Sequence, residues 1–252
     1  MRIFFLLLWL STTPLVAGTL GKHPLEQPVR LKGVFERIVA HTGFRLSFNA
    51  RTLCPNWVAW ELTASEAQAE GKRYDRFEPD PALPYALQVV HADYKGSGYD
   101  RGHMCPAADM KWEKRAQQEC FYMSNICPQE PSLNSGAWKK LEEACRRWAK
   151  REGSVYIVTG PVFKPRQHIE TIGRKVKISV PHGFFRAVLS LRKGKEKAIA
   201  FYYENRAGKQ AMAGRAMTID ALERMLGMDF FPGLEDALER KLESQMRFEH
   251  WQ

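Results

Sequence analysis

Four consecutive residues near the middle of the chain, Asp100-Arg101-Gly102-His103, combine side chains that catalysis commonly uses. A histidine can take up a proton near neutral pH, and an arginine can hold a phosphate through paired hydrogen bonds. A glycine lets the backbone approach a neighbour closely. Two roles stay open for Asp100, orienting the histidine or shaping the turn. The combination is suited to cleavage of a phosphodiester bond, with His103 as general base.

A second group of polar residues follows on a stretch with helical periodicity. Asn134, Glu142 and Arg146 are spaced by multiples of four, so a helix places them along one side. Asn134 offers the neutral oxygen that a hydrated Mg²⁺ accepts, and Glu142 can hold water of the ion's hydration shell. The alternatives are a helix N-cap at Asn134 and an ordinary surface carboxylate at Glu142.

Arginines near these residues are candidates for neutralising a phosphate. They are Arg101 in the motif, Arg146 on the helix and Arg73 in a polar upstream loop. Arg76 lies so close to Arg73 in that loop that either residue can be the phosphate ligand. For both, the alternative is an exposed, solvated side chain.

The order of these motifs resembles the DNA/RNA non-specific endonucleases, which are sugar-non-specific nucleases of the ββα-metal (His-Me finger) class. The resemblance covers most of the chain after residue 56. Its segments are 57–62, 99–109, 124–129, 133–138, 141–142, 159–163 and 219–232. It implies an α+β fold with a central antiparallel β-sheet, helices on both sides, and a ββα-metal finger at the active site.

The resemblance also implies roles for the polar residues. His103 matches the general base, Asn134 the direct Mg²⁺ ligand, and Glu142 the carboxylate that holds the ion's hydration water. Arg73, Arg101 and Arg146 match catalytic, phosphate-binding arginines. The implied cofactor is Mg²⁺, with Mn²⁺ as a substitute, and the implied partners are DNA and RNA, bound through the phosphate backbone. No motif that would read base edges is evident.

The elements that must position these residues can be predicted from periodicity. Alternation of apolar and polar residues predicts strands, and apolar residues at helical spacing predict helices. Strands are expected over 44–49, 56–62, 120–127, 154–159, 174–180, 184–191 and 198–203, and helices from 133 to about 151, after 220 and after 234. The sequence favours one endonuclease domain over 41–252, preceded by a lead-in over 19–40 with a short helix near 34–39.

Composition adds a partner class and a compartment. The net charge is +10 over 252 residues, which favours nucleic acid or a membrane surface as partner. Residues 1–18 have the layout of a signal peptide, so we expect a secreted or periplasmic protein that leaves the membrane after cleavage. An exported protein permits disulfides, and one or two are expected among the five cysteines, with their pairing open.

Three alternatives to a nuclease site were considered. A zinc site could use His103 with Cys105, Cys120, Cys127 and Cys145, but close Cys-x-x-Cys pairs are absent. A non-catalytic basic nucleic-acid-binding module would explain the charge but not the ordered His, Asn and Glu. An exported phosphoesterase of small substrates would have a similar site.

Overall fold

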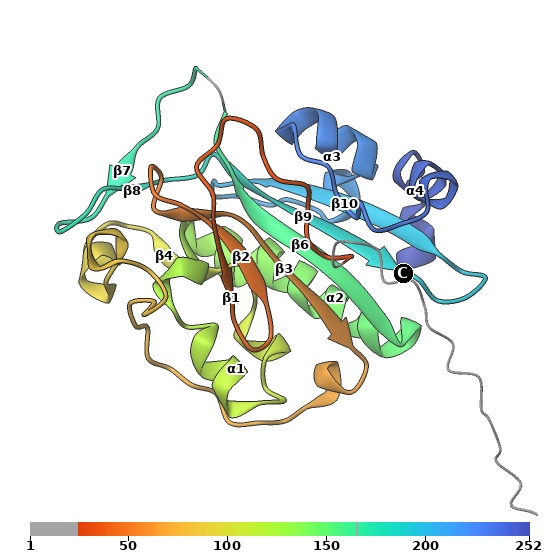
Figure 1. Cartoon of the computed structure of the whole chain (residues 1–252), viewed down its shortest axis with the longest axis horizontal. Coiled ribbons are helices and arrows are strands. Elements are labelled where there is room, and N and C mark those ends of the chain that lie inside the picture. The colour runs from red at the N-terminus through yellow and green to blue at the C-terminus, as the bar shows by residue number, and fades with distance from the viewer. Residues whose placement is uncertain (1–24, 165) are drawn as a thin grey trace, which may run out of the picture.

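Most of the chain's strands join one large antiparallel sheet. The computed structural model describes residues 25–164 and 166–252, and in them the sheet has seven strands in the order β1-β2-β3-β6-β9-β10-β11 (Figure 1). Its strands are β1 (Arg37–Ala40), β2 (Arg45–Asn49), β3 (Cys54–Thr63), β6 (Ser154–Val162), β9 (Gly183–Ser190), β10 (Lys197–Glu204) and β11 (Ala216–Met217). A separate short pair joins β7 (Thr171–Ile172) to β8 (Ile178–Ser179).

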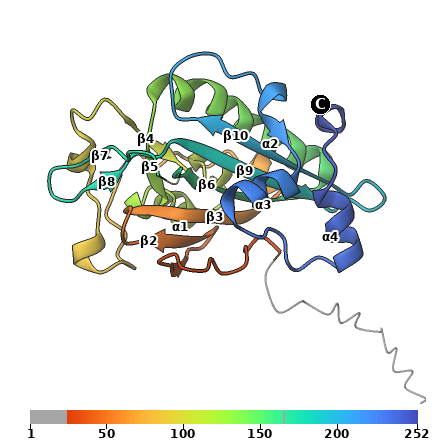
Figure 2. The same cartoon turned by 90° about the horizontal axis from the view of Figure 1, so that it is seen from above.

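Helices cover both faces of this sheet. The long helix α2 (Lys139–Glu152) lies on one face, and α3 (Ile219–Leu226) and α4 (Asp236–Glu243) lie on the other (Figure 2). Alternation along β9 explains the two layers, because successive side chains of a strand point to opposite faces. Phe184 packs in the core under α2, whereas Phe185 packs in the core under α3 and α4. This confirms the predicted α+β fold.

A small strand pair beside the main sheet carries the central motif. β4 (Asp100–His103) pairs antiparallel with β5 (Ile126–Gln129), and α2 follows β5 after one irregular turn. Between the two strands lie short turns and the helix α1 (Lys114–Glu119). Gly102 is required here, because a Cβ on it would lie 2.1 Å from Oε1 of Gln129 on the paired strand. The two strands and the helix form the expected ββα arrangement.

Two predicted elements differ in the structure. Residues 37–40 form the edge strand β1, where a lead-in ending at residue 40 with a short helix was expected, so the sheet begins at Arg37. The buried strand expected over 120–127 begins only at Ile126, because the chain turns at 123–125, and it continues through Pro128. Pro128 is compatible with β5 because both strands of a two-stranded pair are edge strands, where a proline is tolerated. The predicted signal peptide 1–18 lies outside the described residues.

The expected disulfides are absent. All five cysteines lie in the described part of the chain, and each is a buried free thiol. Cys105, Cys120 and Cys145 have no exposed surface and belong to the core cluster under α2. A buried free cysteine packs as a small apolar side chain. The cysteine cluster therefore serves the core, and the disulfide prediction was wrong.

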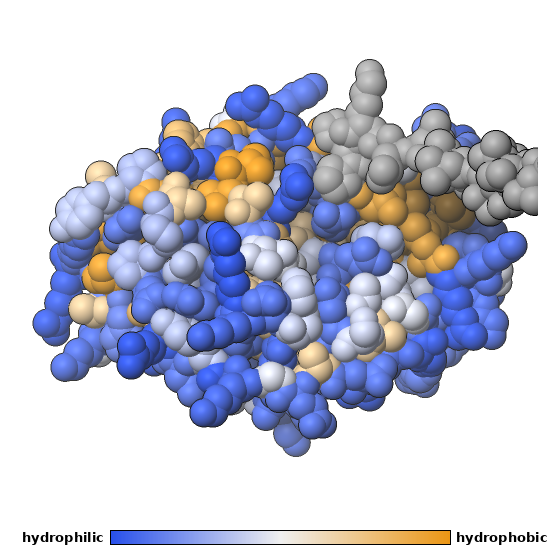
Figure 3. Space-filling view, turned by 60° about the horizontal axis from the view of Figure 1, so that its bottom comes forward, coloured by the Kyte–Doolittle hydropathy of each residue, from blue (hydrophilic) through white to orange (hydrophobic). Residues whose placement is uncertain are grey.

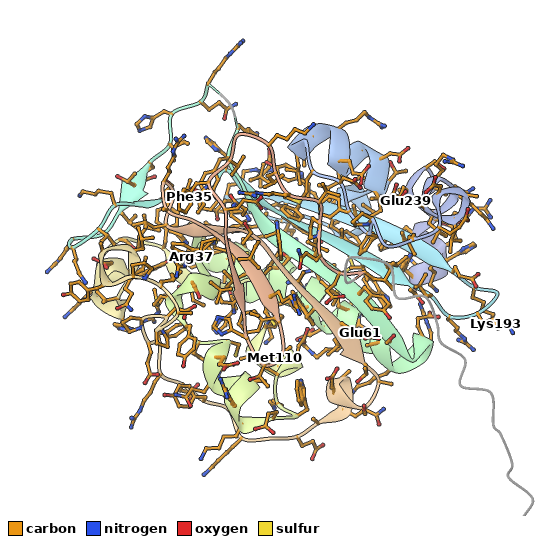
Figure 4. The ribbon with its side chains drawn as sticks, in the orientation of Figure 1. Phe35, Arg37, Glu61, Met110, Lys193 and Glu239 are labelled. Carbon is orange, nitrogen blue, oxygen red and sulfur yellow. The ribbon has the colours of Figure 1, made fainter. Side chains whose placement is uncertain are left out.

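The surface is mainly polar. Hydrophilic residues cover most of the face in Figure 3, with small apolar patches between them. Among the exposed apolar side chains are Phe35 and Ile38 at the outer edge of the sheet, at 45% and 48% exposure. Figure 4 shows Phe35 and Arg37 beside this edge. Within the described residues no helix combines the length and the apolar character that a bilayer crossing requires.

Candidate active site

His103 ends β4 and lies in an aromatic environment. Its ring meets Phe121 edge-on at a centroid distance of 4.8 Å and lies 5.4 Å from the ring of Phe77. Its Nε2 is buried and has no hydrogen-bond partner among the described residues. Burial, together with the charges of Arg73 and Arg101, lowers the pKa of His103 to about 3. The ring is therefore neutral at pH 7 and can accept a proton.

Asn134 is held by the strand that carries the histidine. Its Nδ2 donates a 2.9 Å hydrogen bond to Oδ2 of Asp100. Asp100 therefore contacts the asparagine, which is neither of the two roles left open for it. Because the aspartate accepts only from the amide nitrogen, the amide oxygen of Asn134 points away and remains available to a cation. The residues present thus fit a hydrated divalent ion.

The helix that carries Asn134 starts with an irregular turn. Residues 133–138 form a π-helical turn before α2 begins at Lys139. Glu130 caps its start, because its carboxylate accepts from the backbone N–H of Leu133 at 2.8 Å. The backbone N–H of Asn134 is itself bonded to the carbonyl of Glu130, so Asn134 is not the N-cap. Such π turns widen a helix locally and often occur at functional sites.

Glu142 lies one turn into α2, nearly enclosed. Its side chain is 15% exposed, and its Oε1 lies 3.8 Å from the guanidinium of Arg186 on β9. Burial raises the pKa of Glu142 to about 7, and the nearby Asp109 adds to the rise, whereas Arg186 and Arg146 oppose it. The carboxylate therefore changes charge near neutral pH. An ordinary surface carboxylate would not do so, which argues against that alternative.

Arg186 was not predicted from the sequence as a site residue. It is fully buried on β9 and lies over the ring of Trp138 at 4.6 Å. Its Nη2 donates to the carbonyl of Met104, next to His103, while the same group faces Glu142. Arg186 thus links the strand of the histidine to the helix of the glutamate. The sequence feature that could have identified Arg186 is a single charged residue within the mostly apolar strand β9.

Two of the predicted arginines face the histidine. Arg73 lies over the ring of Phe121 at 5.2 Å, and Arg101 lies over the ring of Phe77 at 4.7 Å. Both charges act on His103, as its lowered pKa shows. Arg101 also donates to the ring of His91 at 2.6 Å. Of the two loop arginines, Arg73 is the one that lies over the ring of Phe121, which meets His103 edge-on.

Arg146 is placed differently from the other two arginines. It donates a 2.8 Å hydrogen bond to Oδ1 of the buried Asp109, and its side chain is 18% exposed. Its charge is therefore already paired. This ion pair joins α2 to the short turn at Ala107–Asp109 that follows β4.

Asn125 holds the chain just after the histidine, a role that was not predicted for it. Its side chain accepts from the backbone N–H of Cys105 at 2.9 Å and donates to the carbonyls of Cys105 and Cys120.

The zinc alternative fails, because within the described residues no group suited to one ion includes His103 or a cysteine.

Curated relatives are nucleases. The chain is 32% identical over 221 residues to "Nuclease 1, mitochondrial" of Schizosaccharomyces pombe, covering 81% of this chain and 69% of the relative. It is 32% identical to human "Nuclease EXOG, mitochondrial", covering 86% of this chain and 63% of the relative. It is 30% identical to human "Endonuclease G, mitochondrial", covering 86% and 74%.

These relatives correct the predicted compartment. Their names place them in mitochondria, as does the name of the similar "Mitochondrial nuclease" of Saccharomyces cerevisiae. The prediction of a secreted or periplasmic protein was therefore wrong, and the names point to mitochondria instead. A short basic start followed by an apolar run was insufficient to assign the compartment.

A family model and a solved structure agree with the site. The chain resembles a crystal structure described as the EndoG/EndoGI complex, with a TM-score of 0.74 and 27% identity, covering 82% of this chain and 89% of that one. The family model for the DNA/RNA non-specific endonuclease matches residues 24–237. Members of this family are metal-dependent hydrolases. This chain belongs to the DNA/RNA non-specific endonucleases.

Proposed function

We propose that the chain hydrolyses phosphodiester bonds of DNA and RNA with Mg²⁺ as cofactor and Mn²⁺ as a substitute. The observation that carries the proposal is the hydrogen bond between Asp100 and Asn134. Asp100 begins the strand β4, and His103 ends the same strand. The bond orients the amide of Asn134, the proposed metal ligand, beside the strand that carries the neutral base His103. A non-catalytic binding module has no need of either group.

His103 is the general base that takes the proton of the attacking water. In the free protein its pKa is low because burial and two guanidinium groups disfavour the charged ring. A phosphate held by Arg73 and Arg101 would offset that repulsion and raise the pKa of His103. The substrate would thus strengthen the base only when a backbone phosphate is in place.

Asn134 would hold the magnesium ion through its amide oxygen, and Glu142 would hold the ion's hydration shell. When bound, the ion supplies charge stabilisation at the phosphoryl and leaving oxygens. Arg73 and Arg101 add positive charge at the same phosphate, which accounts for binding through the backbone with no base preference. Arg146, paired with Asp109, would act on the phosphate mainly by fixing α2 beneath it.

Purified protein should digest supercoiled plasmid DNA and a structured RNA when Mg²⁺ is added. Cleavage should stop with excess EDTA and return with Mg²⁺ or Mn²⁺, because the charge on the leaving oxygen needs a cation. Gel electrophoresis over a range of metal concentrations measures this directly. Hydrolysis of a small phosphodiester alone, with intact DNA and RNA at every metal concentration, would favour the small-substrate alternative.

The rate of DNA cleavage should fall with acidity as Glu142 takes up a proton. The folded protein raises the pKa of Glu142 to about 7, so its carboxylate is ionised above that pH and progressively lost below it. Below pH 7 we expect the rate to drop about tenfold per pH unit. In the free enzyme the pKa of His103 is about 3, so at DNA concentrations well below saturation the acid limb of the rate reports Glu142 and not the base.

Glu142→Gln tests this assignment. The variant should be slow at every pH from 5 to 9 and should lack the acid limb, while Glu143→Gln on the same helix keeps the acid limb, with its midpoint slightly lower because Glu143 helps raise the pKa of Glu142. An acid limb of unchanged midpoint in Glu142→Gln would assign the titration to another group. Initial rates on plasmid DNA, measured at saturating Mg²⁺ in constant ionic strength, give both profiles.

A further inference from the structure

A cluster of carboxylates lies between the two C-terminal helices, on the sheet face opposite α2. Asp220 and Glu223 come from α3 and Glu243 from the end of α4. One oxygen from each of the three lies within 4.8 Å of the other two. Two ligands on opposite sides of an ion at about 2.4 Å are about that far apart. The three side chains can therefore contact one ion.

Glu243 gives independent evidence that something else belongs in this cluster. The residue is 7% exposed, and its Oε1 is buried with no hydrogen-bond partner among the described residues. A buried carboxylate without a partner is strongly unfavourable, so native proteins pair such groups or use them to coordinate metals. The carboxylate that carries this unpartnered oxygen has one oxygen within 4.8 Å of an oxygen of Asp220 and of Glu223.

The surroundings of Glu243 are acidic, although the whole chain carries a net charge of +10. Burial, together with the charges of Glu223, Glu239, Asp229 and Asp220, raises the pKa of Glu243 to about 8. Figure 4 shows Glu239 on α4 where this helix approaches α3. The cation nearest in the described contacts is Arg224, 3.9 Å from Asp220 and largely exposed. It does not reach the buried oxygen.

Part of the cluster is fixed by the backbone. Oε1 of Glu223 accepts a 2.8 Å hydrogen bond from the N–H of Phe230, in the segment that connects α3 to α4. This bond ties the connection to the helix and sets the position of the carboxylate. The ligands are therefore brought together by the packing of α3 and its connection to α4, with two of them on α3 and the third at the end of α4.

We propose that Asp220, Glu223 and Glu243 bind a Ca²⁺ ion that joins α3 to α4, at a site distinct from the nuclease centre. Carboxylate oxygens are hard ligands, which favour Ca²⁺ or Mg²⁺ over softer metals. Calcium accepts irregular sets of ligands at 2.3–2.6 Å, whereas Mg²⁺ demands near-octahedral geometry at shorter distances. Bound calcium would displace the proton of the buried Glu243, give its carboxylate a partner and stabilise the C-terminal layer.

Thermal unfolding with Ca²⁺ tests the proposal without measuring nuclease activity. EDTA-treated protein should melt about 5 °C higher when Ca²⁺ exceeds its dissociation constant about a hundredfold. Asn134→Ala should show the same rise, because it changes only the proposed ion ligand of the nuclease site. Glu243→Gln should lose the rise, and Glu249→Gln, an exposed control in the C-terminal turn, should keep it. Isothermal titration of Asn134→Ala should give one Ca²⁺ per chain.

Three results would overturn the site. They are an unchanged melting temperature with Ca²⁺, a rise that Asn134→Ala abolishes, and a full rise in Glu243→Gln. If Glu243→Gln does not fold, Asp220→Asn replaces it, since Asp220 is only half-buried and its amide still fills the position. Loss of one calcium ligand must then reduce the rise by at least half, and an undiminished rise refutes the assignment. Because cleavage is not the readout, failure here leaves the proposed nuclease chemistry untouched.

Discussion

Replacing His103 with alanine is expected to lower the rate of DNA cleavage on the order of 10³-fold while leaving DNA binding intact. The base is lost, but Arg73 and Arg101 still present positive charge to a phosphate. The ring packs against Phe121 and Phe77, so its removal leaves a small gap in an aromatic cluster. We expect the fold to persist, because the strand β4 is held by its pairing with β5 and by Asn125.

His168→Ala is the matched control, since His168 is exposed and makes only a backbone contact through its carbonyl. Single-turnover cleavage and fluorescence anisotropy with a labelled duplex separate the chemical step from binding. A His103→Ala protein that binds and cleaves normally would contradict the assignment of the base. Parallel loss of binding and cleavage, with a lowered melting temperature, would instead make His103 a structural residue.

Local sequence patterns predicted most of the fold correctly. The strands at 54–63, 183–190 and 197–204 and the helix at 139–152 have strong periodicity, and each was expected within a few residues. Elements whose conformation depends on residues far away in the sequence were harder to predict. The strand Arg37–Ala40 is mostly exposed on its outer side and gains its form by pairing with β2. At four residues it is too short for apolar–polar alternation to distinguish a strand from a helical turn.

The contacts that organise the active site could not be predicted from spacing. Asp100 and Asn134 lie 34 residues apart, and their hydrogen bond depends on how β4 packs against the start of the helix. Arg186 meets Glu142 across the sheet-to-helix interface, from a strand that looked purely structural. The four-residue spacing of Asn134, Glu142 and Arg146 also suggested, wrongly, that all three lie on one regular helix and face the site in the same way. A π turn intervenes, and Arg146 is paired with Asp109.

The wrong disulfide prediction followed from the wrong compartment. An exported chain permits disulfides, and clustered cysteines then suggest bridges. The structure shows the same clustering for a different reason. Cys105, Cys120 and Cys145 are near one another because all three fill the core between α2 and the finger strands. Sequence proximity could not separate a core packing role from a covalent one.

Replacing Asn134 with alanine is expected to lower cleavage at least about 10²-fold at low Mg²⁺, because the proposed direct oxygen ligand is lost. Asp100→Ala should be milder. It leaves the ligand in place but frees the amide to rotate, so the Mg²⁺ concentration for half-maximal cleavage should rise about 10- to 100-fold. At saturating Mg²⁺ the Asp100→Ala enzyme should approach the normal rate. Initial rates across a magnesium titration distinguish the two effects.

A swapped pair gives the sharpest control. In the double variant Asp100→Asn with Asn134→Asp, the amide at position 100 can donate to one carboxylate oxygen at position 134, so the 2.9 Å contact survives with reversed polarity. The other carboxylate oxygen still faces the ion. We expect this variant to recover much of the activity lost in Asn134→Ala, whereas Asn134→Asp alone should recover less because it sets two carboxylates against each other. Equal activity of the single and double aspartate variants would show that Asp100 does not orient the residue at position 134.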